Sequence, residues 1–462
     1  MNDDRRAPLV PPIGRTAWLA LALNTLSCLG SGLTMPFLII YLHDVRGLSL
    51  PTAGLVLSAI GVIGVITTPL SGPLIDRVGS LTTFTAGLLI GGIGIGLFAF
   101  ATSVPAALGA AVVYGAASGL MWNGFLTLLT QLVPPGERSA VFALRYMTAN
   151  VAFGTGALIT GLVTFAETSG PYVVVLLTDA ASYVLFAAAL VVLRRRLTPP
   201  PSARETAAPE SGGVQRRIGY RQVLADRALL AALILNSMLM VFAISQTNSG
   251  FGAWVTGGGG GTSRIVGFAF VLNIAVLLII QLPMIRLARG RSRMRGAALA
   301  AVLFAVAWIV LALPTTLGLH GILRDVLQVA SLGVFAVGEA TLSPTLPALI
   351  NDLAPSHLRG RYNAIFSLSN QIGPIVAPAL VGLALGNGLG QSYLYSLAAV
   401  CLVVAGLALA ARRVIPVGAD IGDLSEQSAT AVTEDTTNTV AGDVMPDAEE
   451  SSSVQHATPE KG

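Results

Sequence analysis

Long apolar runs constrain this sequence more than any other feature. A helix needs about 20 apolar residues to cross a bilayer core, and twelve runs of roughly that length follow one another along the chain. We expect transmembrane helices near residues 17–42, 53–74, 82–101, 106–132, 140–165, 172–193, 228–247, 264–285, 297–313, 323–350, 363–385 and 391–411. The pattern predicts an all-α integral membrane protein with twelve transmembrane helices in two sets of six.

The composition leaves no room for a large water-facing surface. Hydrophobic residues make up 53% of the 462 residues and charged residues 11%, whereas a soluble domain carries about 25% charged residues. The net charge of +4 does not indicate a nucleic-acid partner, because the arginines lie in short loops and form no continuous basic face. The lipid bilayer is therefore the expected environment, and no nucleic acid is expected.

The loop arginines also predict an orientation, because positive charge is retained on the cytoplasmic side of a membrane. If the N-terminus is cytoplasmic, the segments on the other side of the membrane hold only Arg46, Arg264 and Arg324. We expect a multi-pass protein of the cell membrane with both termini in the cytoplasm. The predicted organisation is a cytoplasmic tail over 1–16, a six-helix bundle over 17–193, a cytoplasmic linker over 194–227, a second six-helix bundle over 228–413 and a disordered acidic cytoplasmic tail over 414–462.

An internal repeat relates the two sets of helices. A shift of 221 residues places Arg138 on Arg359 and Gly161 on Gly382. Two six-helix halves in the same orientation are typical of transporters built from parallel repeats. The repeat therefore predicts two bundles with the same internal arrangement.

The segment after the second predicted helix carries a resemblance to a known family. It reads Gly72-Pro-Leu-Ile-Asp76-Arg77-Val-Gly79, which resembles the signature loop between helices 2 and 3 of the major facilitator superfamily. The stretches at 338–344 and 361–374 are similar to the superfamily's helix 10–11 region. The resemblance covers residues 15 to 413 and implies two six-helix bundles related by a pseudo-two-fold axis.

Within the superfamily, the chain looks most like the twelve-helix bacterial drug/proton antiporters. This implies a secondary active transporter that exports small amphipathic compounds by alternating access, through antiport, in the context of multidrug efflux and antibiotic resistance. The proton gradient would be the energy source, without a cofactor, and we expect the protein to function as a monomer. Two alternatives stay open: a proton-coupled importer of a sugar or other metabolite, and a polytopic membrane enzyme or scaffold.

Away from the helix ends, three charged residues stand out within the predicted helices, where a charge is costly and needs a reason. Glu339 lies near mid-depth in the tenth helix and either carries a proton or is held by a permanent hydrogen bond. Asp179 in the sixth helix is either a structural hydrogen-bonding group or a second proton-coupling group. Arg145 lies about two turns inside the fifth helix. It binds an anionic substrate group, holds a carboxylate, or extends to the cytoplasmic interface.

The resemblance implies a central cavity lined by helices 1, 4, 7 and 10. Methionine and aromatic side chains adapt to varied apolar ligands, which suits a small-molecule substrate site. Besides Arg145, the expected cavity residues are Asn24, Cys28, Ser31, Met35, Ser118, Trp122, Asn123, Asn236, Met240, Phe335 and Ser343. The alternative for each of them is ordinary helix packing.

A gating role is expected for the signature residues Gly72, Asp76, Arg77 and Gly79. An aspartate can stabilise the positive N-terminal end of a helix, in this case a helix of the other half. Such a contact would stabilise the state closed to the cytoplasm and would break as the halves rock. The alternative is a solvated loop pair.

Several motifs are missing from the sequence. It contains no GxxxxGK[ST] phosphate-binding loop, which argues against ATP as the driving force. It contains no GxSxG nucleophile motif, and its four histidines do not show metal-ligand spacing. We therefore expect neither an enzyme nor a metal-binding protein.

Overall fold

The computed structural model describes residues 13–134, 137–164, 169–194, 223, 225–288, 290–355 and 358–421. These residues form helices and connecting turns without a strand, and twelve helical spans are long and apolar enough to cross a membrane. The fold class predicted from the apolar runs is confirmed. Most of the predicted N-terminal tail, of the linker and of the acidic tail lies outside the described residues.

The first six spans run from Arg15 to Val192. Their elements are α1 (Arg15–Thr34), η1 (Met35–Phe37), α2 (Leu38–Ile40), η2 (Tyr41–Val45), α3 (Leu50–Val78), α4 (Ser80–Phe100), α5 (Val104–Leu132), α6 (Arg138–Val163) and α7 (Ser169–Val192). Polar residues begin several of these helices: the Ser49 and Ser103 side chains accept hydrogen bonds from backbone N–H groups of the first turns of α3 and α5.

The second six spans run from Arg227 to Ala411. Their elements are α11 (Arg227–Leu239), η4 (Met240–Ile244), η5 (Thr247–Phe251), α12 (Gly252–Thr256), α13 (Ser263–Ala288), α14 (Arg293–Thr316), α15 (Gly321–Leu342), α16 (Leu346–Leu353), α17 (Arg359–Gly386), α18 (Gly390–Ala411) and the short α19 (Val417–Ile421). The seventh span continues to Thr256, beyond the expected end near residue 247, because two π-helical segments carry it onward.

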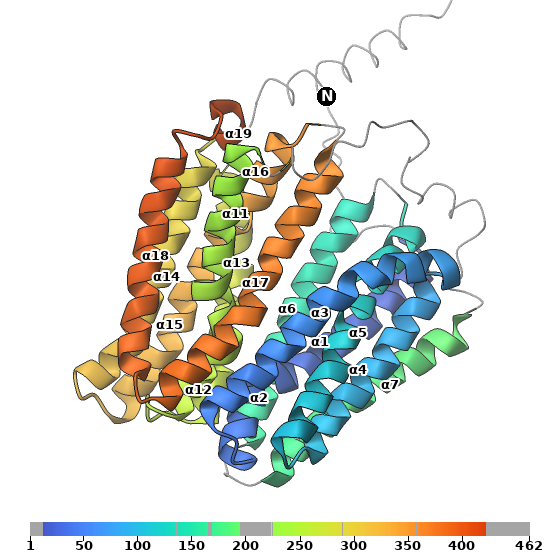
Figure 1. Cartoon of the computed structure of the whole chain (residues 1–462), viewed down its shortest axis with the longest axis horizontal. Helices are drawn as coiled ribbons and strands as arrows, with labels where there is room; N and C mark the ends of the chain where they lie inside the picture. The colour runs from blue at the N-terminus through green and yellow to red at the C-terminus, as the bar shows by residue number, and fades with distance from the viewer. Residues whose placement is uncertain are drawn as a thin grey trace, which may run out of the picture.

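Each set of six spans forms its own bundle. In the first bundle α4 packs against α5 and α7, and α1 packs against α6; in the second, α14 packs against α15 and α18. Figure 1 shows the two bundles inclined to each other, close together where α2 and α12 lie and spread apart where α16 and α19 lie. The most extensive contacts between the bundles are made by α3 with α17 and by α6 with α13, and smaller ones join η1 with η5 and α2 with α12.

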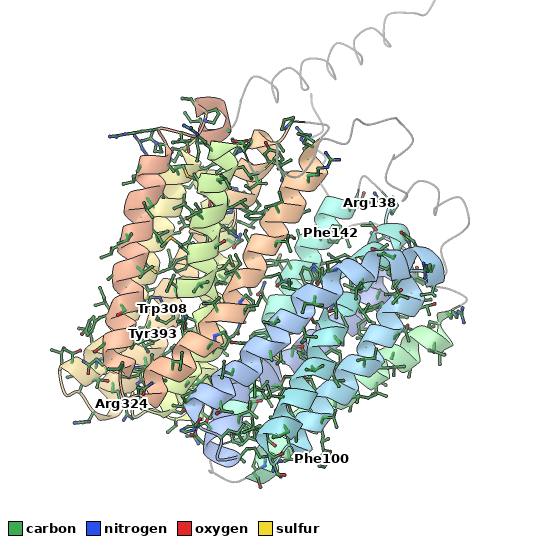
Figure 2. The ribbon with its side chains drawn as sticks, viewed as in Figure 1. Phe100, Arg138, Phe142, Trp308, Arg324 and Tyr393 are labelled. Atoms are coloured by element: carbon green, nitrogen blue, oxygen red, sulfur yellow. The ribbon has the colours of Figure 1, made fainter. Side chains whose placement is uncertain are left out.

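Two ends of the molecule can be told apart by their charge. We call one the arginine-rich end, since Arg77, Arg138, Arg293 and Arg359 lie at the helix termini there. Figure 2 shows Arg138 at this end, with Phe100 and Arg324 at the opposite end. The two bundles meet toward the opposite end.

Glycines make the close contact between the bundles possible. A Cβ atom on Gly161 of α6 would lie 2.7 Å from the carbonyl oxygen of Ser263, and a Cβ atom on Gly382 of α17 would collide with the carbonyl of Leu50. Small residues allow membrane helices to approach backbone to backbone. These two glycines are 221 residues apart and make equivalent contacts, so the sequence repeat corresponds to a structural repeat.

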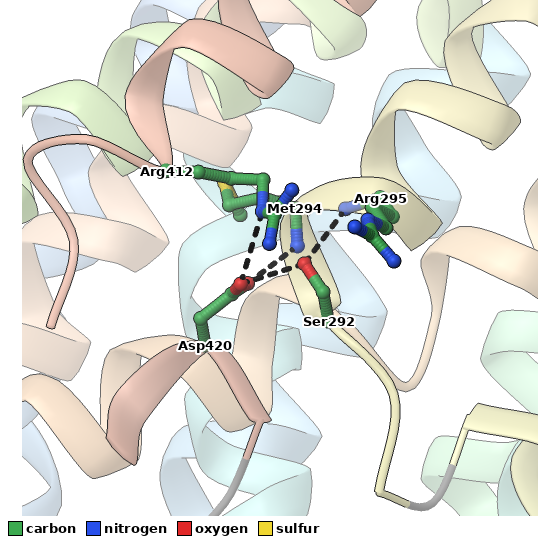
Figure 3. A network of polar contacts seen from close by, with 5 residues as sticks. All are labelled: Ser292, Met294, Arg295, Arg412 and Asp420. Atoms are coloured by element: carbon green, nitrogen blue, oxygen red, sulfur yellow. Dashed lines mark hydrogen bonds and ion pairs between the residues drawn. The ribbon is translucent and has the colours of Figure 1, made fainter. Parts of the chain in front are cut away.

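The structure corrects the prediction that the tail is disordered from residue 414. Residues 414–421 lead into α19, where the Asp420 side chain is buried (Figure 3). Its carboxylate accepts hydrogen bonds from Ser292 Oγ at 2.6 Å and from the backbone N–H of Met294 at 2.9 Å, and it lies 3.5 Å from Nε of Arg412. The carboxylate therefore stabilises the N-terminus of α14, which holds the start of the tail against the bundle.

Candidate functional site

Glu339 lies beside a break in the tenth span. Helix α15 ends at Leu342, and α16 begins at Leu346 after a turn that contains Pro344. Nδ2 of Asn273, on the neighbouring helix α13, donates a hydrogen bond to Oε2 of Glu339 at 3.1 Å. Asn273 was not identified in the sequence, because an amide inside an apolar run carries no pattern that links it to a distant carboxyl.

The other bundle also approaches Glu339. Tyr146 on α6 lies near enough to interact electrostatically with the Glu339 carboxyl, and half of its side chain is exposed. Among the described residues, no arginine forms an ion pair with Glu339. The carboxyl is therefore only partly buried, bonded to a neutral amide, and faces the space between the bundles.

Asp179 lies inside the first bundle. Its side chain is completely buried, and Oδ2 accepts a hydrogen bond from the Thr34 hydroxyl at 2.6 Å. The Ser182 side chain also interacts with this carboxyl. Next to it, the Tyr183 hydroxyl bonds with Ser31 Oγ at 2.9 Å and with the Tyr114 hydroxyl at 3.3 Å. The sequence indicated Ser31 and Asp179 but not the two tyrosines and the threonine that surround them.

Arg145 joins three helices of the first bundle. Its Nε donates a hydrogen bond to Oδ1 of Asn24 on α1 at 3.3 Å. Its guanidinium carbon lies 5.0 Å from the ring centroid of Trp122 and 5.4 Å from that of Phe125, both on α5. Asn24 in turn donates to Sγ of Cys28 at 3.5 Å. The guanidinium is thus held inside the bundle wall by described partners and does not extend to the interface.

Other expected cavity residues of the first bundle face a neighbouring helix. Asn123 donates hydrogen bonds to Ser71 Oγ at 2.6 Å and to the Thr68 carbonyl at 3.4 Å, both on α3. Ser118 bonds to the Gly115 carbonyl of its own helix at 2.7 Å. Asn123 therefore links α5 to α3, and the Ser118 hydroxyl bonds to a backbone carbonyl of its own helix.

The two methionines expected in the cavity each begin an irregular helical segment. Met35 begins the 3₁₀ segment η1 in the first span, and Met240 begins the π-helical segment η4 in the seventh. Both are half-buried. Irregular helical segments of this kind often mark hinges or functional sites.

Two residues expected in the cavity are placed elsewhere by the structure. Phe335 is fully buried against Phe304 and Trp308, with ring centroids 4.4 Å and 5.6 Å away, because that face of α15 packs on α14. Asn236 is also buried, and its Nδ2 donates to Ser369 Oγ and to Asn370 Oδ1, each at 2.8 Å.

Helical spacing alone put Phe335 on the face of Glu339, but the helix packing turns it away from the space between the bundles. Ser343, at the end of α15, is exposed and accepts a hydrogen bond from Gln281 Nε2 at 2.6 Å.

The signature loop lies at the arginine-rich end. Helix α3 ends at Val78 and is followed by Gly79, whose φ of +87° is a conformation that favours glycine. Asp76 and Arg77 are exposed, and a Cβ atom on Gly72 would meet no described atom within 4 Å. The described part of the second bundle therefore leaves this loop uncovered in a structure whose bundles are spread apart at this end.

Known proteins share both the sequence pattern and the fold. The Major Facilitator Superfamily model matches residues 20–323 and 260–434. The chain is 24% identical over 372 residues to the uncharacterized MFS-type transporter YqjV of Bacillus subtilis, covering 80% of this chain and 86% of that protein. It is 26% identical over 144 residues to the quinolone resistance protein NorA of Staphylococcus aureus, covering 31% of this chain and 37% of NorA.

Solved transporters have the same architecture. The peptide transporter POT in complex with sulfate superposes with a TM-score of 0.69 at 17% identity, covering 91% of this chain and 100% of that chain. The nucleoside transporter NupG superposes with a TM-score of 0.67 at 17% identity, covering 87% and 100%. The chain therefore belongs to the major facilitator superfamily, and it is a membrane-spanning secondary transporter and not an enzyme.

Proposed function

We propose that this transporter exports small amphipathic compounds in exchange for protons across the cell membrane. The arginine-rich end faces the cytoplasm, as the retention of positive charge on that side requires. The partial similarity to NorA, a quinolone resistance protein, supports export as the direction. In this proposal the protein works as a monomer, powered by the proton gradient without a cofactor.

The observation that carries the proposal is the setting of Glu339. Its described hydrogen-bond partner is the neutral amide of Asn273, so protonation breaks no described ion pair. The carboxyl lies beside a helix break and faces the other bundle, where it can exchange a proton as the bundles separate. Asp179 is the second candidate for proton coupling, because its carboxyl is completely buried and forms no ion pair among the described residues.

We further propose that the signature loop between α3 and α4 controls which end of the transporter is closed. With the arginine-rich ends apart, Asp76 is exposed. When these ends close, Asp76 approaches the second bundle and stabilises the N-terminal end of α17, the partner helix of α3. The states closed and open to the cytoplasm then differ by a contact that forms in only one of them.

Transport in proteoliposomes under an imposed pH gradient tests this function. We expect Glu339→Gln to bind substrate but to lose transport driven by the gradient, while Glu137→Gln, a matched change at the start of α6, keeps it. An unchanged gradient dependence in Glu339→Gln would remove Glu339 from the mechanism. Parallel measurements of dye efflux and of labelled sugar uptake decide between export and import.

A further inference from the structure

The two terminal nitrogens of Arg145 have no hydrogen-bond acceptor among the described residues. Its Nε is bonded to Asn24, but the described residues provide no hydrogen-bond acceptor for either terminal nitrogen and no carboxylate within ion-pair distance. An arginine inside a membrane protein normally pairs with an acid or with carbonyl groups. Among the described residues, the terminal nitrogens are therefore available to an anion from outside the protein.

The surroundings hold the guanidinium in one orientation. Trp122 and Phe125 lie against it at 5.0 and 5.4 Å, and Asn24 fixes the Nε edge. A guanidinium presents its N–H donors as a rigid fork that matches the two oxygens of a carboxylate. With Nε occupied, the two terminal nitrogens are the donors left for such a ligand.

An apolar surface adjoins the charged group. The Trp122 side chain on α5 is 57% exposed, so one part of the indole is available beyond its contact with Arg145. An aromatic ring that stacks on indole would bring an attached carboxylate next to the guanidinium. The site thus selects two features at once, an anionic group and a flat apolar body.

Neighbouring acidic side chains do not cancel the preference of this site for an anion. Asp179 is enclosed within the first bundle and bonded to Thr34. Glu339 belongs to the other bundle and is bonded to Asn273. The wall formed by α1, α5 and α6 around Arg145 therefore attracts anions and disfavours cations.

We propose that Arg145, Asn24 and Trp122 bind the carboxylate and the adjoining ring of an aromatic monocarboxylate, and that such compounds are substrates of this transporter. The proposal names the substrate class of the transport function given above and rests on that function.

Equilibrium binding to the purified full-length protein in lipid nanodiscs tests the proposal without any gradient. Three probes share one ring system: 2-naphthoate, the neutral 2-naphthamide and the cationic 2-naphthylmethylammonium. We expect 2-naphthoate to bind about tenfold or more tightly than the amide, as loss of a charge-assisted bidentate pair implies, and the cation to bind most weakly.

Substitutions test whether Arg145 causes the tighter binding of 2-naphthoate. Arg145→Gln is expected to bind 2-naphthoate and the amide equally, and Arg145→Lys to keep a reduced preference because it retains the charge without the fork. Trp122→Ala should weaken both probes alike. Thermal unfolding verifies that each variant is folded, and Arg145→Lys serves as the test if Arg145→Gln does not fold.

Three results would overturn the proposal: no binding of 2-naphthoate to the wild type, preference for the cation, or a carboxylate preference that survives in Arg145→Gln. Since the assay uses no pH gradient, its failure is distinct from failure of proton-coupled export. If Glu339→Gln loses transport driven by the pH gradient but still binds 2-naphthoate, the first result supports proton-coupled export and the second supports the carboxylate site at Arg145.

Discussion

Neighbouring residues on one helix can have unrelated tasks in this transporter. Phe335 and Glu339 are one helical turn apart on α15, yet the ring packs into the second bundle and the carboxyl faces the first. Which task a residue has depends on what covers its face of the helix.

Phe335→Ala is expected to lower the free energy of unfolding by about 3 kcal/mol or more, because it leaves a cavity against Phe304 and Trp308. The apparent KM for substrate should stay unchanged. Trp122→Ala should show the opposite pattern, a raised KM with little loss of stability, because its ring is largely exposed. Chemical denaturation in detergent and transport kinetics measure the two effects, and a raised KM in Phe335→Ala alone would contradict the assignment.

Asp179→Ala is expected to destabilise the protein by about 1–3 kcal/mol, because the buried Thr34 hydroxyl loses its nearer acceptor and keeps only the Ser31 carbonyl at 3.4 Å. Asp179→Asn keeps an acceptor oxygen and should unfold at nearly the wild-type temperature. Thermal unfolding of both variants measures this difference. Equal destabilisation by the two substitutions would show that the carboxyl itself, and not the hydrogen bond, is required.

At the scale of elements, helix packing decides where the bundles touch. The pairs α3–α17 and α6–α13 join the halves through glycines near the opposite end. At the arginine-rich end, the Asp420 contacts join α19 to α14 and lie within one bundle. The glycine contacts between the bundles therefore affect the equilibrium between conformations. The Asp420 contacts, which lie within one bundle, affect its stability.

Gly54→Val is expected to disfavour the state in which the opposite end is closed, because a Cβ atom at Gly54 would collide with the Pro378 carbonyl. When the opposite end opens, the rocking of the halves closes the arginine-rich end. A single cysteine at Met147, an exposed position on α6, should then react more slowly with a water-soluble maleimide. Gly406→Val is the matched control, since a Cβ atom there meets no described atom within 4 Å. Unchanged labelling in Gly54→Val would show that this contact does not hold the bundles together.

Removal of the Asp420 carboxylate should destabilise the second bundle by about 1–2 kcal/mol, the usual effect of losing a helix-capping side chain. Asp420→Ala and truncation after Ile415 should lower the unfolding temperature alike, whereas truncation after Ile421 should not, because it retains every contact in Figure 3. A truncation after Ile415 that unfolds at the wild-type temperature would contradict this role.

For the molecule as a whole, the sequence was sufficient for the architecture and insufficient for the site. Apolar runs reveal twelve spans because lipid requires them, and Gly161 and Gly382 reveal the repeat because close helix contacts need the same small residue twice. Side-chain contacts between distant helices leave no such pattern. Asn273 beside Glu339, and Tyr114 and Tyr183 beside Asp179, became visible only when the helices were packed.

Distances at the two ends of the molecule test the central claim, that the halves rock about a site between them. Spin labels at positions 78 and 360 report on the arginine-rich end, and labels at 55 and 389 report on the opposite end, in a Cys28→Ser, Cys401→Ser background. Electron–electron double resonance in nanodiscs, with and without substrate and at two pH values, should show the first distance shortening as the second lengthens. Distances that stay fixed under all conditions, or that change in the same direction in a protein that still transports, would contradict the claim.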